Sequence, residues 1–201
     1  MTTPSIHIRL AKFPEDKSTI NKLFQAYEQF VMDYASISLD FQNFAHEVAS
    51  LPGKYSEENR GALYIAFLQT TSPSLDSEPA GVTHKRKPST TLSDVDEGEP
   101  AKQPSSHTLV PIGCVGLRAF TSHSAELKRL FLDPEARGLG TGRLLVEAAV
   151  GKARELGYSE VLLDTLGSMT TARRLYARCG FEEVEAYHES LEGAVFYRLR
   201  L

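Results

Sequence analysis

Hydrophobic and polar residues recur along the chain with two different periods. In residues 5–11 they alternate from one position to the next, which predicts a strand. In residues 14–34 apolar side chains return every three or four positions, which predicts a helix with one broad buried face. A second helix is expected over residues 40–51. The same reasoning predicts further strands over residues 61–69, 109–120, 125–133, 161–165, 181–189 and 194–201, and further helices over residues 144–158 and 169–180.

The order of these elements predicts the fold class. One strand and two helices come first, three strands follow, and a helix, a strand, a helix and two strands complete the chain. This order predicts an α/β fold in the mixed α+β form, a mixed sheet of about seven strands with helices on both faces. We expect the last two strands to form a hairpin through a turn at Gly193.

The apolar pattern is interrupted between two of the expected strands. Residues 71–107 contain half of the ten prolines and no aromatic side chain, so they lack the apolar surface that would offset the entropy of ordering. We therefore predict one domain over residues 1–201 with a disordered insertion at residues 71–107. Within the insertion, HKRKP (residues 84–88) is either a nuclear-import signal or a solvated run of charge.

Composition and charge narrow the function classes. The 201 residues carry a net charge of -4, which argues against a general nucleic-acid or membrane binder. No stretch reaches the ~18 apolar residues of a membrane span, and no signal peptide is evident, so we expect a cytoplasmic protein, or a nuclear one if the basic cluster is an import signal. The two cysteines and six histidines form no metal-binding spacing, so no metal is expected.

A glycine-rich turn lies between an expected strand and an expected helix. Gly138, Gly140 and Gly142 occupy alternate positions and run directly into the helix over residues 144–158. The backbone N–H groups of such a turn, with the positive end of the helix dipole, favour an anion and above all a phosphate. The spacing fits neither the Rossmann fingerprint nor the P-loop. From the residues alone, a phosphate site and a simple tight connection both stay open.

Three segments together resemble one known family. RGLGTG (residues 137–142) fits the R/Q-x-x-G-x-G/A signature of the GCN5-related N-acetyltransferase (GNAT) superfamily. AELKRLFLDP (residues 125–134) resembles the central strand of that family, and ARRLYARCGF (residues 172–181) resembles its late helix. The resemblance covers residues 6–201 apart from the insertion and extends to a subgroup of small, mostly uncharacterised members. It implies a GNAT-like sheet that splays apart at its centre.

The resemblance also implies acetyl-CoA as the co-substrate. In similar proteins the backbone N–H groups of the glycine turn hold the pyrophosphate, and the pantetheine arm pairs with the edge of the central strand. Arg143 either adds charge to this site or is an exposed arginine at the start of the helix. The residues implied in binding are Leu130, Phe131, Leu132, Arg137, Gly138, Leu139, Gly140, Thr141, Gly142 and Arg143.

Acyl transfer to an amine requires a base, because an alkylammonium with a pKa of ~10 keeps its proton at neutral pH. By resemblance, Glu126 at the start of the central strand matches the carboxylate that family members use as the base. The alternative is a surface glutamate paired with Lys128 or Arg129. Asp164 on the next core strand is the reserve candidate, or else a strand-end carboxylate with structural hydrogen bonds.

The departing thiolate requires a proton donor. Tyr176 matches the tyrosine that similar enzymes use for this step, although its spacing on an apolar helix face is also typical of a core aromatic. Many relatives carry an Asn seven residues earlier that contacts CoA, and here that residue is Met169. We therefore predict Tyr176 as the general acid and expect the Asn contact to be missing or replaced.

These residues predict an N-acetyltransferase that moves an acetyl group to a primary amine of a small molecule or amino acid by direct attack in a ternary complex. The alternatives are a protein or histone acetyltransferase acting on lysine or N-terminal amines, and a non-catalytic CoA-binding regulatory domain. A monomer or homodimer is expected. The acceptor is expected between the two N-terminal helices and the C-terminal hairpin, with Tyr27, Phe30, Phe41, Phe44, Tyr187 and His188 as candidate lining residues.

Overall fold

The computed structural model describes residues 5–71 and 107–201. The strands are β1 (Ser5–Leu10), β2 (Ala62–Thr71), β3 (His107–Ala119), β4 (Ser124–Leu132), β5 (Glu160–Leu166), β6 (Glu182–Val184) and β7 (Ala194–Arg200). The α-helices are α1 (Lys17–Ala35), α2 (Phe44–Ala49), α3 (Thr141–Glu155) and α4 (Thr170–Arg178), and the short 3-10 helices are η1 (Asp40–Gln42), η2 (Gly53–Tyr55) and η3 (Pro134–Ala136).

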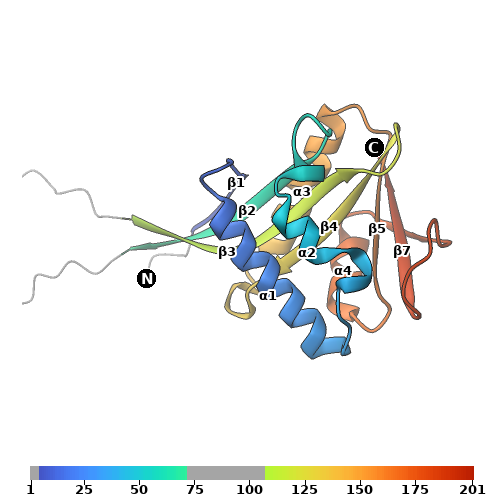
Figure 1. The fold of residues 1–201 in the computed structure, drawn as a ribbon, viewed down its shortest axis with the longest axis horizontal. Helices are drawn as coiled ribbons and strands as arrows, with labels where there is room; N and C mark the ends of the chain where they lie inside the picture. Colours follow the sequence, from blue (N-terminus) through green and yellow to red (C-terminus); the bar gives the residue numbers. More distant parts are fainter. Residues whose placement is uncertain (1–4, 72–106) are drawn as a thin grey trace, which may run out of the picture.

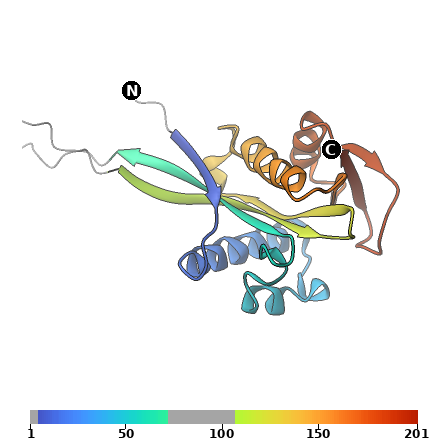
Figure 2. The same cartoon turned by 90° about the horizontal axis from the view of Figure 1, so that it is seen from above.

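The seven strands form one mixed sheet in the order β1-β2-β3-β4-β5-β7-β6 (Figure 1). Strands β4 and β5 pair in parallel, and the other neighbours pair antiparallel. Helices α1 and α2 cover one face, while α3 and α4 cover the other (Figure 2). The predicted mixed sheet with helices on both faces is therefore confirmed.

Each face of the sheet carries its own hydrophobic core. On the α1 face, the buried positions Ile20, Leu23, Phe24 and Val31 follow the helical spacing seen in the sequence. Helix α3 buries its apolar side against the opposite face of the sheet. These periodic apolar positions explain the two layers, because a helix with one apolar side must bury that side against another element.

Helix α1 begins later than the sequence pattern predicts. Residues 13–16 form a turn, and the Asp16 carboxylate accepts hydrogen bonds from Arg9 Nη1 and from the Lys12 N–H, each at 2.6 Å. The guanidinium hydrogen bond lowers the pKa of Asp16 even though burial acts to raise it. The turn therefore ties the helix start to β1, and residues 14–16 of the expected helix lie outside it.

Two other expected elements differ from the structure. The helix expected over residues 40–51 is broken into η1 and α2, because Asn43 takes a left-handed conformation with φ of 56°. The strand expected over residues 181–189 ends at Val184, although it pairs with β7 as predicted. Beyond it the chain leaves the sheet, and Tyr187 packs on Phe120 with ring centroids 5.1 Å apart.

Strands β2 and β3 lie on either side of the segment expected to be an insertion. They pair from Ala62↔Leu117 as far as Thr71↔His107. Residues 72–106, with the HKRKP cluster, lie outside the described residues. Among the helices that the structure describes, none combines the length and apolar character needed to cross a membrane.

Candidate active site

The parallel pairing of β4 with β5 is short and then opens. Residues 124–126 pair with residues 160–162, after which β4 continues along β3 and β5 continues along β7. In the described part of the chain, one edge of β4 over residues 127–132 therefore has no strand partner. A cavity of about 690 Å³ lies along this edge. It is lined by Tyr27, Phe30, Val31, Tyr34, Leu39, Gln42, Arg137, Gly138, Leu175, Tyr176, Arg178, Ser190, Leu191, Ala194 and residues 127–132, 140–143, 164–166 and 169–172.

A β-bulge in β4 directs neighbouring side chains to different faces. The register shifts between Cys114 and Gly116, and Arg129 on the bulged strand has φ of 59°. Phe131 then joins the core under α1, whereas Leu130 and Leu132 pack on the core under α3. The predicted strand residues 130–132 all line the cavity.

The glycine turn presents free backbone donors to the same cavity. Gly138 and Gly140 have φ of 83° and 79°, and Gly140 is the N-cap of α3. Across the described ranges, no hydrogen-bond acceptor contacts the N–H groups of residues 138–142. A Cβ on Gly138 or Gly140 would meet no atom within 4 Å. The turn therefore leaves open space in front of several donors at a helix N-terminus, which suits an anion.

Gly142 and the side chains of the turn have different surroundings. A Cβ on Gly142 would lie 3.1 Å from Leu175 and 3.2 Å from Leu132, so this glycine lets α3 pack close to α4 and β4. Arg137 stacks over the Phe30 ring at 5.0 Å. Arg143 pairs with Glu147 at 2.7 Å and is 66% exposed. The exposed setting that the sequence left open for Arg143 is therefore observed, although the residue also lines the cavity.

Asp164 brings a carboxylate to the cavity wall. Lys128 Nζ lies 2.9 Å from its Oδ1, and Ser190 Oγ donates to its Oδ2 at 3.3 Å. Burial acts to raise the pKa of Asp164, but the charge and hydrogen bond of Lys128 outweigh it and hold this pKa below its ordinary value. Asp164 is therefore an ionised group within reach of a bound amine.

Glu126 lies behind the cavity wall on β4. It is 0% exposed, so the surface alternative does not apply. Arg118 Nε donates to its Oε2 at 2.6 Å, and the Tyr187 hydroxyl donates to its Oε1 at 3.3 Å. Glu126 is not among the residues that line the cavity. The carboxylate predicted as the base is therefore enclosed by its own partners.

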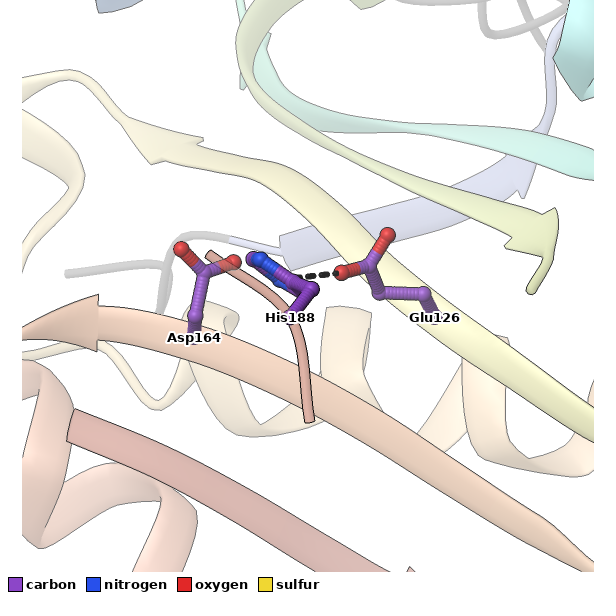
Figure 3. Close-up of side chains that lie close together, drawn as sticks. All are labelled: Glu126, Asp164 and His188. Atoms are coloured by element: carbon purple, nitrogen blue, oxygen red, sulfur yellow. Dashed lines mark ion pairs between the residues drawn. The ribbon is translucent and has the colours of Figure 1, made fainter. Parts of the chain in front are cut away.

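A histidine joins the two carboxylates (Figure 3). His188 Nε2 lies 3.5 Å from Glu126 Oε1, and the three side chains place one ligand atom each within 4.8 Å of one another. Arg118 and Lys128 already pair with the two carboxylates. Glu126, Asp164 and His188 therefore belong to one network of ion pairs with Arg118 and Lys128.

Tyr176 lies on the cavity wall contributed by α4. It is 7% exposed, and its ring packs against Phe181 and Tyr197 at centroid distances of 5.9 and 6.1 Å. Burial, reinforced by nearby groups such as Asp164, raises the pKa of Tyr176. No hydrogen bond from its hydroxyl to another described residue is present. Met169 also lines the cavity, seven residues earlier, and Thr165 Oγ1 donates to its sulfur at 3.6 Å.

The residues expected to line the acceptor site separate into groups. Tyr27 and Phe30 line the cavity. Phe44 does not: it is buried in the core and stacks on Phe24 at 6.1 Å. Tyr187 and His188 lie beside Glu126 instead of in the cavity wall. The side chain of Phe41 lies outside what the structure describes.

A buried ion pair beneath the cavity was not anticipated from the sequence. Arg129 donates to Glu47 at 2.9 and 2.8 Å, and Lys54 and the Tyr55 hydroxyl each contact Glu47 at 2.6 Å. Arg129 also donates to Gln42 Oε1 at 2.7 Å. The partners are 82 residues apart in the chain, so no local spacing could have revealed them. The network holds α2 against the bulge of β4.

This network predicts a specific loss of stability in acid. Burial acts to raise the pKa of Glu47, but Arg129, Lys54 and Tyr55 together lower it from 4.5 to about 2. As the pH falls, Glu47 takes up a proton in the unfolded chain before it does so in the folded protein. Ionised Glu47 therefore adds about 3 kcal/mol to the free energy of unfolding above pH 4.5, and this contribution is lost as the pH falls to about 2. Urea unfolding at a series of pH values measures it.

The matched variant for this measurement is Glu47→Gln. It is expected to lower the free energy of unfolding at neutral pH by ~3–5 kcal/mol, because Arg129 loses its buried counter-charge. The difference between native protein and variant should shrink as pH falls from about 4.5 to about 2. A difference that stays constant over this range would contradict the prediction.

The chain is similar to one known protein family and to two relatives over their full length. Residues 60–181 match the model of the acetyltransferase (GNAT) family. An uncharacterized N-acetyltransferase of Schizosaccharomyces pombe is 30% identical over 204 residues, which cover 100% of this chain and 98% of the relative. An uncharacterized N-acetyltransferase of Dictyostelium discoideum is 29% identical over 224 residues, which cover 96% and 99% of the two chains.

Solved structures show the same fold. A GNAT-family acetyltransferase of Staphylococcus aureus Mu50 superposes with a TM-score of 0.64 at 15% identity, covering 98% of this chain and 99% of the other. A putative acetyltransferase of Salmonella typhimurium with its cofactor acetyl-CoA gives 0.58 at 16% identity, covering 97% and 93%. The family match over most of the chain and the full-length relatives agree with the splayed sheet and the glycine turn. The chain belongs to the GNAT family of N-acetyltransferases.

Proposed function

We propose that the protein transfers the acetyl group of acetyl-CoA to the primary amine of a small molecule or an amino acid, by direct attack in a ternary complex. One observation carries the proposal: the glycine turn, the free edge of β4, Tyr176 and Asp164 all line the same cavity. Family membership supports the reaction class. The Salmonella typhimurium structure of the same fold supports the donor, because that protein holds acetyl-CoA.

The donor half of the cavity fits a phosphate-bearing ligand with a long amide arm. The turn offers free N–H groups in front of Gly138 and Gly140, where a side chain would fill the space. Arg137, Arg143 and Arg178 add positive charge to the cavity lining. The edge of β4 offers backbone groups with which amides can pair as an added strand does. When bound, acetyl-CoA supplies the acyl group as an activated thioester.

Tyr176 is proposed as the general acid. Burial raises its pKa, so the phenol keeps its proton at neutral pH and can give it to a departing sulfur. Its place on the cavity wall and its hydroxyl, which has no partner among the described residues, leave that proton available. The core-aromatic alternative accounts for the ring contacts but not for the free hydroxyl at the cavity.

Asp164 is proposed to hold the acceptor ammonium. It is the ionised carboxylate of the cavity wall, and Tyr27 and Leu39 provide apolar and aromatic surface for the rest of the acceptor. Glu126 remains the candidate base, but Arg118 and Tyr187 enclose its carboxylate. A proton can therefore reach Glu126 only through a neighbouring side chain.

Direct attack is supported by the surroundings of the two cysteines. Cys114 is 0% exposed, and burial raises the pKa of its thiol. Burial also raises the pKa of Cys179. Neither residue is among those that line the cavity. A thiol with a raised pKa carries little thiolate at neutral pH and is a poor nucleophile for a covalent route.

A hydrogen bond between α1 and the segment before α4 favours a small acceptor over a protein segment. The Tyr34 hydroxyl at the end of α1 donates to the Ser168 carbonyl at 2.7 Å, just before α4. Tyr34 and Met169, from the two linked segments, both line the cavity. This link joins opposite sides of the site, and a lysine in an extended protein segment would need an open groove there.

The test is an acetyl-CoA turnover screen that measures thiol release with polyamines, amino acids, aminoglycosides and histone peptides. We expect turnover above the hydrolysis background with at least one small amine and no comparable rate with the peptides. Turnover restricted to peptides would favour the protein acetyltransferase alternative. CoA binding without turnover of any amine would favour the regulatory domain, and absence of both binding and turnover would reject the proposal.

A further inference from the structure

We propose that His188 accepts the proton of the acceptor ammonium and passes it to solvent, with Glu126 and Asp164 stabilising the charged ring. The proposal rests on the proposed function and adds a residue to it. In Figure 3 the imidazole lies between the two carboxylates, coming from the segment that follows β6, while Glu126 and Asp164 come from the diverging strands β4 and β5. Three separate parts of the chain therefore meet at one point.

The hydrogen bonds of His188 define which ring nitrogen can take the proton. Nδ1 lies 2.7 Å from the carbonyl oxygen of Glu189. A carbonyl oxygen only accepts, so Nδ1 must carry a hydrogen. In the neutral ring, Nε2 then has a free lone pair, and it lies 3.5 Å from Glu126 Oε1. The fixed tautomer leaves Nε2 as the proton-accepting atom.

The surroundings hold the ring in place and connect it to both the cavity and solvent. Phe196 and Tyr187 pack edge-on against the imidazole, with ring centroids 5.2 and 4.8 Å away. A ligand atom of His188 lies within 4.8 Å of one of Asp164, which lines the cavity. The His188 side chain is 27% exposed. An ammonium held by Asp164 would thus lie close to the imidazole ring.

Four charged side chains face this cluster from three strands. Glu126 and Lys128 come from β4, Asp164 from β5 and Arg118 from β3. Arg118 forms an ion pair with Glu126, and Lys128 forms one with Asp164. The carboxylates can stabilise an imidazolium between them, as the Asp of a catalytic triad does for its histidine.

The proton transfers balance. One N–H bond of the ammonium breaks and an Nε2–H bond forms, which gives a neutral amine and an imidazolium that returns its proton to water. The amine lone pair then forms the C–N bond as the C–S bond breaks. Tyr176 gives its proton to the departing sulfur. The nitrogen loses a second proton, which restores the hydroxyl of Tyr176. No oxidant, reductant or metal is required.

The experiment compares His188→Gln and His188→Ala with the native protein, using an amine found in the turnover screen. For both variants we expect kcat/KM for the amine to fall by ~10²-fold. KM for acetyl-CoA should stay within about twofold, because the glycine turn is untouched. The dependence of kcat/KM on pH should differ between the native protein and both variants, because the variants lack the group that takes the proton. Added imidazole should restore the rate of His188→Ala in proportion to its neutral form.

His7→Gln is the matched control, because His7 lies on β1, at the opposite end of the sheet from β6, and its ring contacts Gln69. It should retain the native rate and pH profile. A second measurement does not depend on the variants: ¹⁵N NMR of the native protein should show the Nδ1–H tautomer for neutral His188.

The His188 variants and the tautomer test the role of His188, whereas turnover by the native protein tests the proposed function. His188 variants that keep their rate, or that lose rate with an unchanged pH profile and no imidazole rescue, would overturn the proposal while leaving the proposed function intact. An Nε2–H tautomer would also overturn it. Absence of turnover by the native protein with every amine would overturn both.

Discussion

Tyr176→Phe is expected to lower kcat for acetyl transfer by ~10²- to 10³-fold while KM for acetyl-CoA stays within about twofold. The substitution removes only the hydroxyl, so the ring can keep its packing against Phe181 and Tyr197. Without that proton the sulfur must leave as a thiolate. Steady-state thiol release with a saturating amine measures the change.

A matched control separates catalysis from stability. Tyr158→Phe removes the hydroxyl of another buried tyrosine, one that donates to the Arg60 carbonyl at 2.9 Å. It should cost ~1 kcal/mol of stability and leave kcat unchanged. If Tyr176→Phe retains the native kcat, the tyrosine is only a core residue and the general-acid proposal is rejected.

Gly140→Ala is expected to raise KM for acetyl-CoA by ~10- to 100-fold, with a smaller effect on kcat. The new Cβ meets no protein atom within 4 Å, so it projects into the open space in front of the turn. A phosphate held there would lose one or two hydrogen bonds to the backbone, and bonds to charged groups contribute ~1.5–3 kcal/mol each. Isothermal titration with CoA measures the loss of affinity directly.

The control for backbone strain is Gly157→Ala. Gly157 has φ of 75°, close to the 79° of Gly140, and its Cβ would also meet nothing within 4 Å. Both variants should lose ~1–2 kcal/mol of stability, because alanine disfavours this conformation. Only Gly140→Ala should weaken CoA binding. Equal CoA affinities in the two variants would mean that the turn is only a tight connection.

Most of the fold followed from periodicity because its strands and helices each have one apolar side. The strand and helix order along the chain was predicted, and the structure differs mainly at element ends. Those ends depend on single contacts that a pattern does not contain. The Asp16 carboxylate delays the start of α1, and Asn43 interrupts the second helix.

The candidate site was predictable in part. The strand, turn and helix around Gly138–Arg143 are contiguous in the sequence, so their spacing and resemblance could identify a donor site. Asp164 and Tyr176 were also candidates, and both line the cavity. Arg129 and Glu47 were not, since a bulge in β4 and a separate helix bring them together.

By itself the sequence determined the mixed sheet, the layers on its faces and the glycine turn, because periodicity and short motifs are local properties of the chain. Only the tertiary structure decided how the reactive groups are arranged. Glu126, Asp164 and His188 lie far apart in the chain and converge where β4 and β5 part. Their burial, ion pairs and access to the cavity depend on neighbours from other elements, and those neighbours are set by packing.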